Sequence, residues 1–270
     1  MHLPQELVDY IIDLLHDNPT TLAQLSLVSR AWVSRARVHL CETMVITRPK
    51  LLSSNLAHLT PLCEYTKILH LAWLNHSTNP SAVLRLLDCF EQSEPHTLAV
   101  HSCDLHRLDE QTIRRCFAKF PCTSITTLEL HDISTTQRTF LVLLSSFPNV
   151  DDLSISVNRC WDDRLGPGQL GSNDNEILQP TSPHFKGSFK FSDPLGHGVY
   201  GYARCKLLRT IALFPLQFQT VSLDTKEQSW EDALIFLHSC SKTTRRMFVN
   251  LAHGKYQVMF HATQSRALSV

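Results

Sequence analysis

The chain has 270 residues, with 25 acidic and 25 basic side chains, so its formal net charge is zero at pH 7. Hydrophobic residues make up 43% and charged residues 19%, which is typical of a globular protein and argues against a general affinity for nucleic acid or an anionic membrane. No stretch approaches the ~18 uninterrupted apolar residues of a membrane span. The nine cysteines show no spacing framework, and the first turns carry acids, unlike a signal peptide. We therefore expect a cytoplasmic or nuclear protein with reduced thiols.

The first predicted helix, from Pro4 to about His16, has an unusually wide apolar surface. On a helical wheel its polar residues occupy an arc of roughly 120° and its apolar residues an arc of roughly 200°. A helix that covers one core needs an apolar stripe of only about 100°. A second helix is predicted over Leu22–Val28, capped by Thr20 or Thr21, and a third begins after Ser29. Such a small helical unit cannot cover the wide arc alone, so the pattern predicts a partner outside it.

The segment from Leu3 to Trp32 resembles the F-box family. It reads LPQEL at residues 3–7, IIDLL at residues 11–15 and LAQLSLVSRAW at residues 22–32. The resemblance implies a three-helix unit that binds the Skp-type adaptor of a cullin–RING ubiquitin ligase. The apolar positions that it assigns to adaptor binding are Leu3, Pro4, Leu7, Ile11, Leu25, Val28 and Trp32. The sequence does not separate those that contact the adaptor from those that form the internal core.

Farther along the chain, short apolar strands alternate with helices. The first four predicted strands contain Leu69-x-Leu71, Leu98-x-Val100, Leu128-x-Leu130 and Leu153-x-Ile155. They recur about every 25 to 30 residues with a helical segment in each gap, a period typical of leucine-rich repeats. Further strands are predicted at Phe189–Phe191, Ile211–Leu213, Val221–Leu223 and Met247–Val249, and a helix at Trp230–Cys240. This last region is similar to the repeats of fungal F-box proteins.

The predicted fold class is α+α/β: an N-terminal three-helix F-box followed by an irregular leucine-rich-repeat-like βα solenoid. The predicted domains are the F-box at residues 1–45, a connecting stretch at 46–65, the repeat region at 66–256 and a tail at 257–270. Residues rich in Gly, Pro, Asn and Asp predict long loops near 158–185 and 192–203 in the repeat region.

Two patterns offer residue types for chemistry, but neither has the required context. Residues 195–203, LGHGVYGYA, match the glycine-rich loop of protein kinases, yet the rest of the chain holds none of the other kinase motifs. Zinc-ligand residue types occur at His101, Cys103, His106, Cys116 and Cys122, without the spacing of four converging ligands. We therefore predict no catalytic residue, no metal site and no cofactor.

The resemblance implies a non-catalytic, substrate-recognition subunit of a Skp–cullin–F-box E3 ubiquitin ligase. Its partners would be the adaptor, through it a cullin, and an unidentified protein target, with no nucleic acid or membrane partner. In a repeat sheet the residues between the buried apolar pairs point away from the core. Candidate target-binding residues are therefore His70, Glu129 and Ser154, with Ala99 and Ala212 beside them, and the loop at Asn158–Pro183 is the alternative surface. The alternatives are an interaction scaffold outside any ligase and an enzyme that uses the glycine-rich loop or a histidine site.

Overall fold

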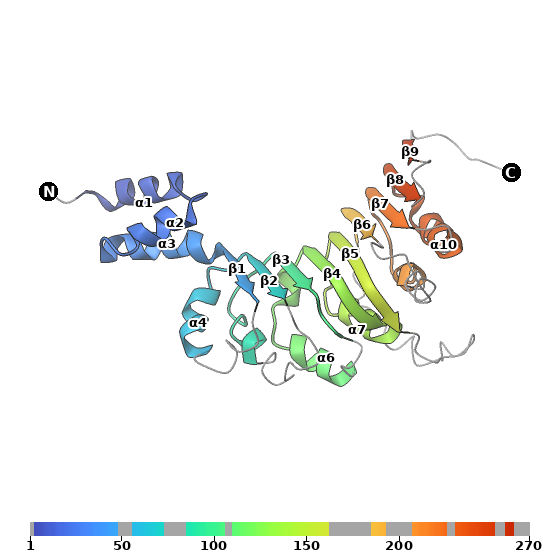
Figure 1. The fold of residues 1–270 in the computed structure, drawn as a ribbon, viewed down its shortest axis with the longest axis horizontal. Coiled ribbons are helices and arrows are strands. Elements are labelled where there is room, and N and C mark those ends of the chain that lie inside the picture. The colour runs from blue at the N-terminus through green and yellow to red at the C-terminus, as the bar shows by residue number, and fades with distance from the viewer. Residues whose placement is uncertain are drawn as a thin grey trace.

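The structure is a computed structural model, and it describes residues 3–47, 56–72, 85–105, 110–161, 185–192, 207–225, 230–251 and 257–261. The molecule is elongated. Three helices form one end, and a curved row of strands extends from them toward the C-terminus (Figure 1). None of the helices in these ranges is long and apolar enough to cross a membrane.

The three N-terminal helices are α1 (Gln5–Leu14), α2 (Pro19–Leu25) and α3 (Arg30–Glu42). Ser29 caps α3 as predicted, because its Oγ accepts a hydrogen bond from the Ala31 N–H at 3.3 Å. The cap of α2 is Asn18 and not Thr20 or Thr21: Asn18 Oδ1 accepts from the Thr21 N–H at 3.0 Å. The small core of the unit consists of Val8, Ile12, Leu22 and Ala36, against which Leu15, Trp32 and Leu40 pack.

The rest of the described chain is built on one nine-stranded sheet. Its strands are β1 (Thr43–Ile46), β2 (Ile68–Ala72), β3 (Thr97–His101), β4 (Thr127–Thr136), β5 (Asp152–Trp161), β6 (Ser188–Ser192), β7 (Thr220–Thr225), β8 (Arg246–Leu251) and β9 (Gln257–His261). Their order in the sheet follows their order in the sequence. Strands β1 to β8 are parallel, and β9 runs antiparallel to β8.

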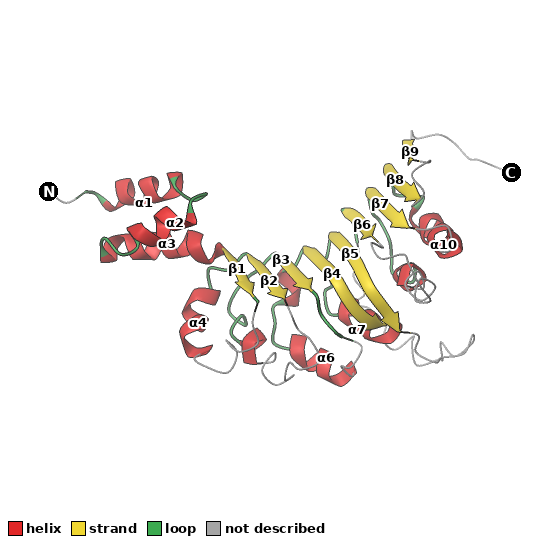
Figure 2. Ribbon diagram, in the orientation of Figure 1, coloured by secondary structure: helices red, strands yellow, loops and turns green. Residues whose placement is uncertain are grey.

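In the part of the chain that the structure describes, helices cover one face of this sheet and none covers the other (Figure 2). They include α4 (Leu56–Cys63), α6 (Glu110–Phe117), α7 (Gln137–Ser145) and α10 (Trp230–Cys240). Alternate strand residues point toward them, and these residues are the apolar pairs that the sequence marks, such as Leu69 with Leu71 and Phe189 with Phe191. Near the C-terminus the core is aromatic: the rings of Phe189 and Phe236 lie 4.6 Å apart. We call the uncovered side the open face.

The predicted fold class, an N-terminal three-helix F-box followed by an irregular leucine-rich-repeat-like βα solenoid, is wrong. The structure shows an α/β fold on a single sheet, with eight consecutive parallel strands and an antiparallel ninth. Strand β1 begins at Thr43, directly after α3, and Thr43 pairs with Ile68 of β2. The chain therefore passes from the helical end into the sheet without an intervening segment. A repeat in the sequence indicates where strands and helices alternate, but it does not show how the strands pair laterally.

Several local predictions are also corrected. The strand predicted at Ile211–Leu213 is absent, since residues 207–211 are helical and residues 212–213 form a turn, and Ala212 therefore lies outside the sheet. Strands β1 and β9 were not predicted, and α4 lies within the predicted connecting stretch. The loop predicted from residue 158 starts too early, because β5 continues to Trp161. The remainder of that loop at residues 162–184, and the glycine-rich segment at 195–203, lie outside the described residues.

Candidate functional site

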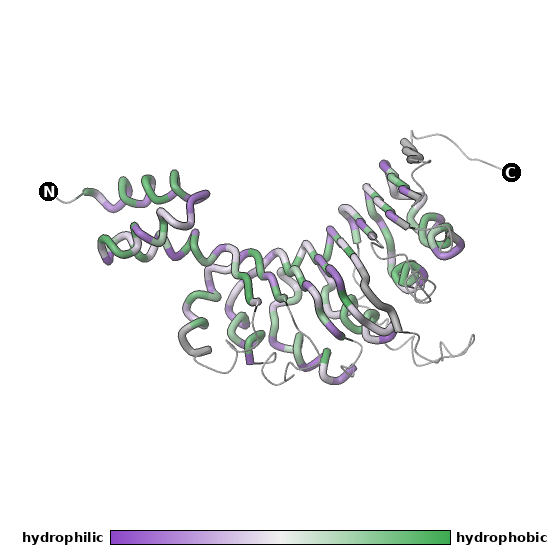
Figure 3. Tube along the Cα trace, in the orientation of Figure 1, coloured by the Kyte–Doolittle hydropathy of each residue, from purple (hydrophilic) through white to green (hydrophobic). Residues whose placement is uncertain are grey.

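Large apolar side chains are exposed together on the N-terminal helices. Leu14 of α1 is 65% exposed, and Leu27 and Val28, between α2 and α3, are 86% and 68% exposed. The hydropathy colouring shows apolar residues along much of α1 (Figure 3). We call the whole set the N-terminal apolar face; its members are Leu3, Leu7, Tyr10, Ile11, Leu14, Leu27 and Val28. Exposed apolar residues that gather in this way mark an interaction site.

The exposed residues of α1 follow from its sequence. Val8 and Ile12, four residues apart, form the buried stripe of the helix. Leu7, Ile11 and Leu14 are spaced four and then three residues apart, so they form a second stripe beside the first. The three-helix unit buries only one of these stripes. The unusual width of the apolar arc in the sequence is thus explained by a second stripe that the described residues leave uncovered.

A polar cluster fixes α1 against α3. Asp13 Oδ1 and Oδ2 accept hydrogen bonds from Arg35 Nε at 2.6 Å and Nη2 at 2.7 Å, and His39 Nε2 lies 2.7 Å from Asp13 Oδ1. The Arg35 guanidinium, followed by His39, holds the pKa of Asp13 well below its usual range. At the other end of α1, Gln5 donates to the Ala31 carbonyl at 3.3 Å. These contacts set the orientation in which the second stripe is presented.

The predicted adaptor-binding residues divide into two groups. Leu3, Pro4, Leu7, Ile11 and Val28 are exposed, whereas Leu25 is half-buried and Trp32 packs against the internal core. Five of the seven are thus exposed, whereas Leu25 and Trp32 are only partly accessible. Tyr10, Leu14 and Leu27 belong to the same face and were not selected from the sequence. For Tyr10 and Leu14 the signal was present, because both lie in the wide apolar arc of the first helix.

The predicted target-binding residues lie in one line across the open face. His70 pairs with Ala99, Ala99 with Glu129 and Glu129 with Ser154, from β2 to β5. The same line continues beyond Ser154 and starts before His70, with Val45, Lys190, Ser222 and Phe248 at the corresponding positions. His70, Glu129 and Ser154 are half-buried, while Ala99 is fully buried between larger neighbours. Ala212, which is not in the sheet, does not join them.

Three histidines stack on the open face of β2 to β4. The His70 and His101 rings are 5.7 Å apart with an interplanar angle of 13°, and those of His101 and His131 are 4.9 Å apart at 24°. We call these three residues the histidine stack. His131 Nε2 lies 3.3 Å from Glu129 Oε2. Burial, and then the neighbouring His131 and His70, lower the pKa of His101, although Glu129 acts in the opposite direction. His101 is therefore favoured in its neutral form.

The backbone changes course immediately after this stack. Ser102 and Asp132, which follow His101 and His131, both have positive φ, at 51° and 54°. Their side chains are joined, since Ser102 Oγ donates to Asp132 Oδ2 at 3.0 Å. Short polar residues tolerate this left-handed conformation better than most. The two neighbouring strands therefore bend together, and the histidines mark the end of the regular part of β3.

Comparison with known proteins supplies no family. No protein-family model matches the sequence, and no curated protein is significantly similar to it. Within the described ranges, no group of three or more His, Cys, Asp and Glu side chains is arranged to hold a metal ion. The two surfaces described above, one apolar and one largely polar, are therefore the candidate sites.

Proposed function

We propose that this chain is the substrate-recognition subunit of a Skp–cullin–F-box ubiquitin ligase, acting in the cytoplasm or nucleus. The N-terminal apolar face binds the Skp-type adaptor, which connects the chain to a cullin. The open face of the sheet binds a protein target. The proposal takes its partner class from the F-box resemblance of residues 3–32, and it does not depend on the fold class inferred with it.

The observation that carries the proposal is the accessible second stripe of α1. Leu7, Ile11 and Leu14 leave apolar surface exposed. If these residues served only to stabilise the fold, we would expect them to be buried or to be polar. Full burial of one such side chain contributes about 1.5–3 kcal/mol. An amphipathic helix that docks in a groove uses anchors at this spacing. The same segment carries the sequence pattern for which an adaptor is the expected partner.

The mechanism is geometric and needs no catalytic residue in this chain. One end holds the adaptor and the other holds the target, so a lysine of the target is kept close to the ubiquitin-loaded enzyme that the complex recruits. Holding two reactants together in this way raises their effective concentration. The subunit is thus non-catalytic and uses neither a cofactor nor a metal. The rigid Asp13–Arg35 pair supports this role by fixing the adaptor-binding helix.

Binding to a purified Skp-type adaptor tests the proposal. The variant Leu7→Asp with Leu14→Asp places two charges on the exposed stripe and leaves Val8 and Ile12 in the core, so we expect a folded protein that loses adaptor binding. The control is Leu213→Asp with Leu234→Asp, the same chemical change at two exposed leucines outside the N-terminal unit. The control should bind like the wild type. Full adaptor binding by the Leu7/Leu14 variant would refute the assignment.

The same preparation separates the ligase from a scaffold outside any ligase. Affinity purification of the full chain from cells treated with a proteasome inhibitor should recover the adaptor and a cullin together with target proteins. Recovery of targets by both double variants, with neither adaptor nor cullin present even for the wild type, would favour the scaffold.

A further inference from the structure

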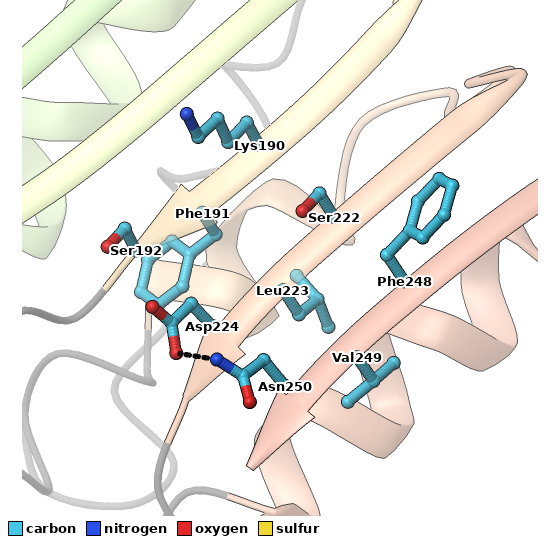
Figure 4. Close-up of a pocket in the computed structure, with 9 residues that line it drawn as sticks. All are labelled: Lys190, Phe191, Ser192, Ser222, Leu223, Asp224, Phe248, Val249 and Asn250. Carbon is cyan, nitrogen blue, oxygen red and sulfur yellow. Dashed lines mark hydrogen bonds between the residues drawn. The ribbon is translucent and has the colours of Figure 1, made fainter. Parts of the chain in front are cut away.

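The open face is hollowed over β6, β7 and β8 by a pocket of about 220 Å³. Figure 4 shows its lining side chains, which come from equivalent positions of the three strands. Those that belong to the open face are Lys190, Ser192, Ser222, Asp224, Phe248 and Asn250. The strands pair in register, so the six residues form two parallel lines of three. The pocket lies on the same face as the histidine stack, at the C-terminal end of the sheet.

The first line combines a cation with an aromatic ring. Lys190 pairs with Ser222, and Ser222 pairs with Phe248, so the lysine and the phenylalanine lie on either side of a small hydroxyl residue. Two strand spacings separate their backbones by about 10 Å. Lys190 is exposed and Phe248 is half-buried. In Figure 4 the Lys190 and Phe248 side chains flank Ser222, whose side chain is much shorter than theirs.

The lysine is not neutralised by its surroundings in the described part of the chain, where it forms no ion pair. The nearest carboxylates by strand register lie diagonally on the two adjacent strands: Asp224, which also lines the pocket, is two residues beyond Ser222, and Asp152 is two residues before Ser154. Each already accepts a hydrogen bond from a residue other than Lys190: Asp224 from Asn250, and Asp152 from Ser188. Arg246 adds a second cation on the open face, two residues before Phe248 on β8. A negatively charged group on the occupant would therefore complement this end of the pocket.

The second line supplies groups for a peptide backbone. Asn250 Nδ2 donates a hydrogen bond to Asp224 Oδ1 at 3.3 Å. Ser192 of β6 pairs with Asp224 of β7. The bond between Asn250 and Asp224 leaves two side-chain oxygens, Asp224 Oδ2 and Asn250 Oδ1, as acceptors for backbone N–H groups. The Ser192 hydroxyl can act as a donor or an acceptor. A pocket with one apolar wall and a few polar groups of this kind is typical of a ligand site.

We propose that this pocket binds an extended segment of a protein partner in which an acidic residue and a large apolar residue are separated by one residue. The acid pairs with Lys190, and the apolar side chain packs on Phe248. In an extended chain, side chains two residues apart point the same way and are about 7 Å apart. The flexible lysine stem covers the remaining distance. The inference deepens the proposed function, on which it rests, by naming the class of target.

Peptide libraries test this directly. The probes are labelled eight-residue peptides, capped at both ends and randomised around a fixed Glu-x-Leu, Lys-x-Leu or Glu-x-Ser core. We expect the immobilised full-length protein to retain the Glu-x-Leu library about fivefold more strongly than the other two. Lys190→Glu should reverse the charge preference, so that Lys-x-Leu is retained best. Phe248→Ala should remove the preference for Leu over Ser.

The matched control is Lys242→Glu, which makes the same charge reversal at an exposed lysine that does not line the pocket. It should retain the wild-type preference. Equal retention of the three libraries by the wild type, or the same reversal in Lys242→Glu as in Lys190→Glu, would overturn the proposal. Lys190→Glu decides the question because it changes an exposed side chain, whereas a loss in Phe248→Ala counts only if its melting temperature stays at the wild-type value.

The outcome is separable from that of the adaptor experiment. Lys190→Glu should bind the Skp-type adaptor like the wild type, since the change lies on β6 and not on the N-terminal helices. If the wild type binds the adaptor but does not discriminate between the peptide libraries, the peptide-binding proposal for the pocket is wrong and the ligase proposal stands. Peptide discrimination without adaptor binding would keep the pocket as a peptide site and remove the ligase.

Discussion

Asp13 of α1 and Arg35 of α3 form a two-point ion pair, with both carboxylate oxygens bound to the guanidinium at 2.6 and 2.7 Å. A planar fork of this kind fixes both distance and orientation, which a single contact does not. The pair joins α1 directly to α3, without involving α2, which lies between them in the sequence. Together with the Gln5–Ala31 contact and the packing of Val8 and Ile12, this carboxylate fixes how the N-terminal apolar face is presented.

Asp13→Asn should loosen α1. The amide cannot accept two charge-assisted bonds from Arg35, so we expect a lower melting temperature and faster proteolysis within α1. The pKa of Asp13 is lowered in the folded state, so its contribution is present above the unfolded value near 4 and is lost as the pH falls below it. Asp17→Asn, at a carboxylate whose side chain is 90% exposed, is the control. Equal melting temperatures for the two variants would contradict this role.

The histidine stack should make the protein sensitive to mild acid. The pKa of His101 is lowered in the folded state, so the unfolded chain binds more protons as the pH falls below about 6.5. The free energy of unfolding therefore decreases as the pH falls from 6.5 toward the folded pKa. In His101→Gln, the drop in melting temperature between about pH 7.5 and pH 5.5 should be smaller than in the wild type. His96→Gln, at an exposed histidine outside the stack, should keep the wild-type drop.

Three buried thiols should be inert in the folded protein. Burial raises the pKa of Cys63 and Cys122 to about 12 and that of Cys116 to about 11. Because the thiolate is the reactive form, we expect no modification of these residues by a disulfide reagent at about pH 8 until a denaturant is added. Site-resolved mass spectrometry measures the rates. Modification of any of the three in the native protein as fast as in the denatured protein would show that this part of the core is open.

Gly187 should not tolerate a side chain. A Cβ at this position would lie 2.5 Å from Asp152 Oδ1 and 3.1 Å from the Asp151 carbonyl oxygen. The same Asp152 oxygen accepts hydrogen bonds from the Ser188 N–H and hydroxyl, which attach β6 to β5. We expect Gly187→Ala to lower the free energy of unfolding by about 1–3 kcal/mol. Lys186→Ala, at the exposed neighbouring residue, should have little effect, and equal losses in both variants would contradict the steric explanation.

Much of the sheet could be predicted from the sequence because its signal is local. In β4 to β7 buried apolar residues alternate with less buried polar ones, as in Leu153-x-Ile155 and Val221-x-Leu223, and the period of two identifies both the strand and its buried side. The same signal failed at Ile211-x-Leu213. Ile211 is buried on a helical turn, whereas Leu213 is 49% exposed, so the two residues do not share a buried side. The two buried residues, Leu208 and Ile211, are three apart, a spacing that fits a helix.

The candidate site was harder to predict because it depends on register. The sequence placed His70, Glu129 and Ser154 on one face, but the alignment of Lys190 with Ser222 and Phe248 follows from hydrogen bonds between strands that lie about 30 residues apart in the chain. Likewise, the sequence pattern did not separate core from accessible positions among the F-box residues, whereas the structure packs the partly buried Trp32 against the internal core and leaves Leu7 exposed. Local pattern selects residue types, and tertiary packing selects which of them remain accessible.

The strand order has a consequence for spacing. Every strand is bonded to its neighbours in sequence, so the number of strands between two positions fixes how far apart they are. From β1, which adjoins the N-terminal helices, to β7, at the centre of the pocket, six steps of about 4.8 Å give a separation of about 29 Å along the sheet. The number of strands thus sets the distance between the N-terminal helices and the pocket. Insertion or deletion of one strand with its helix would change the distance between the N-terminal apolar face and the pocket by about 5 Å and leave both surfaces intact.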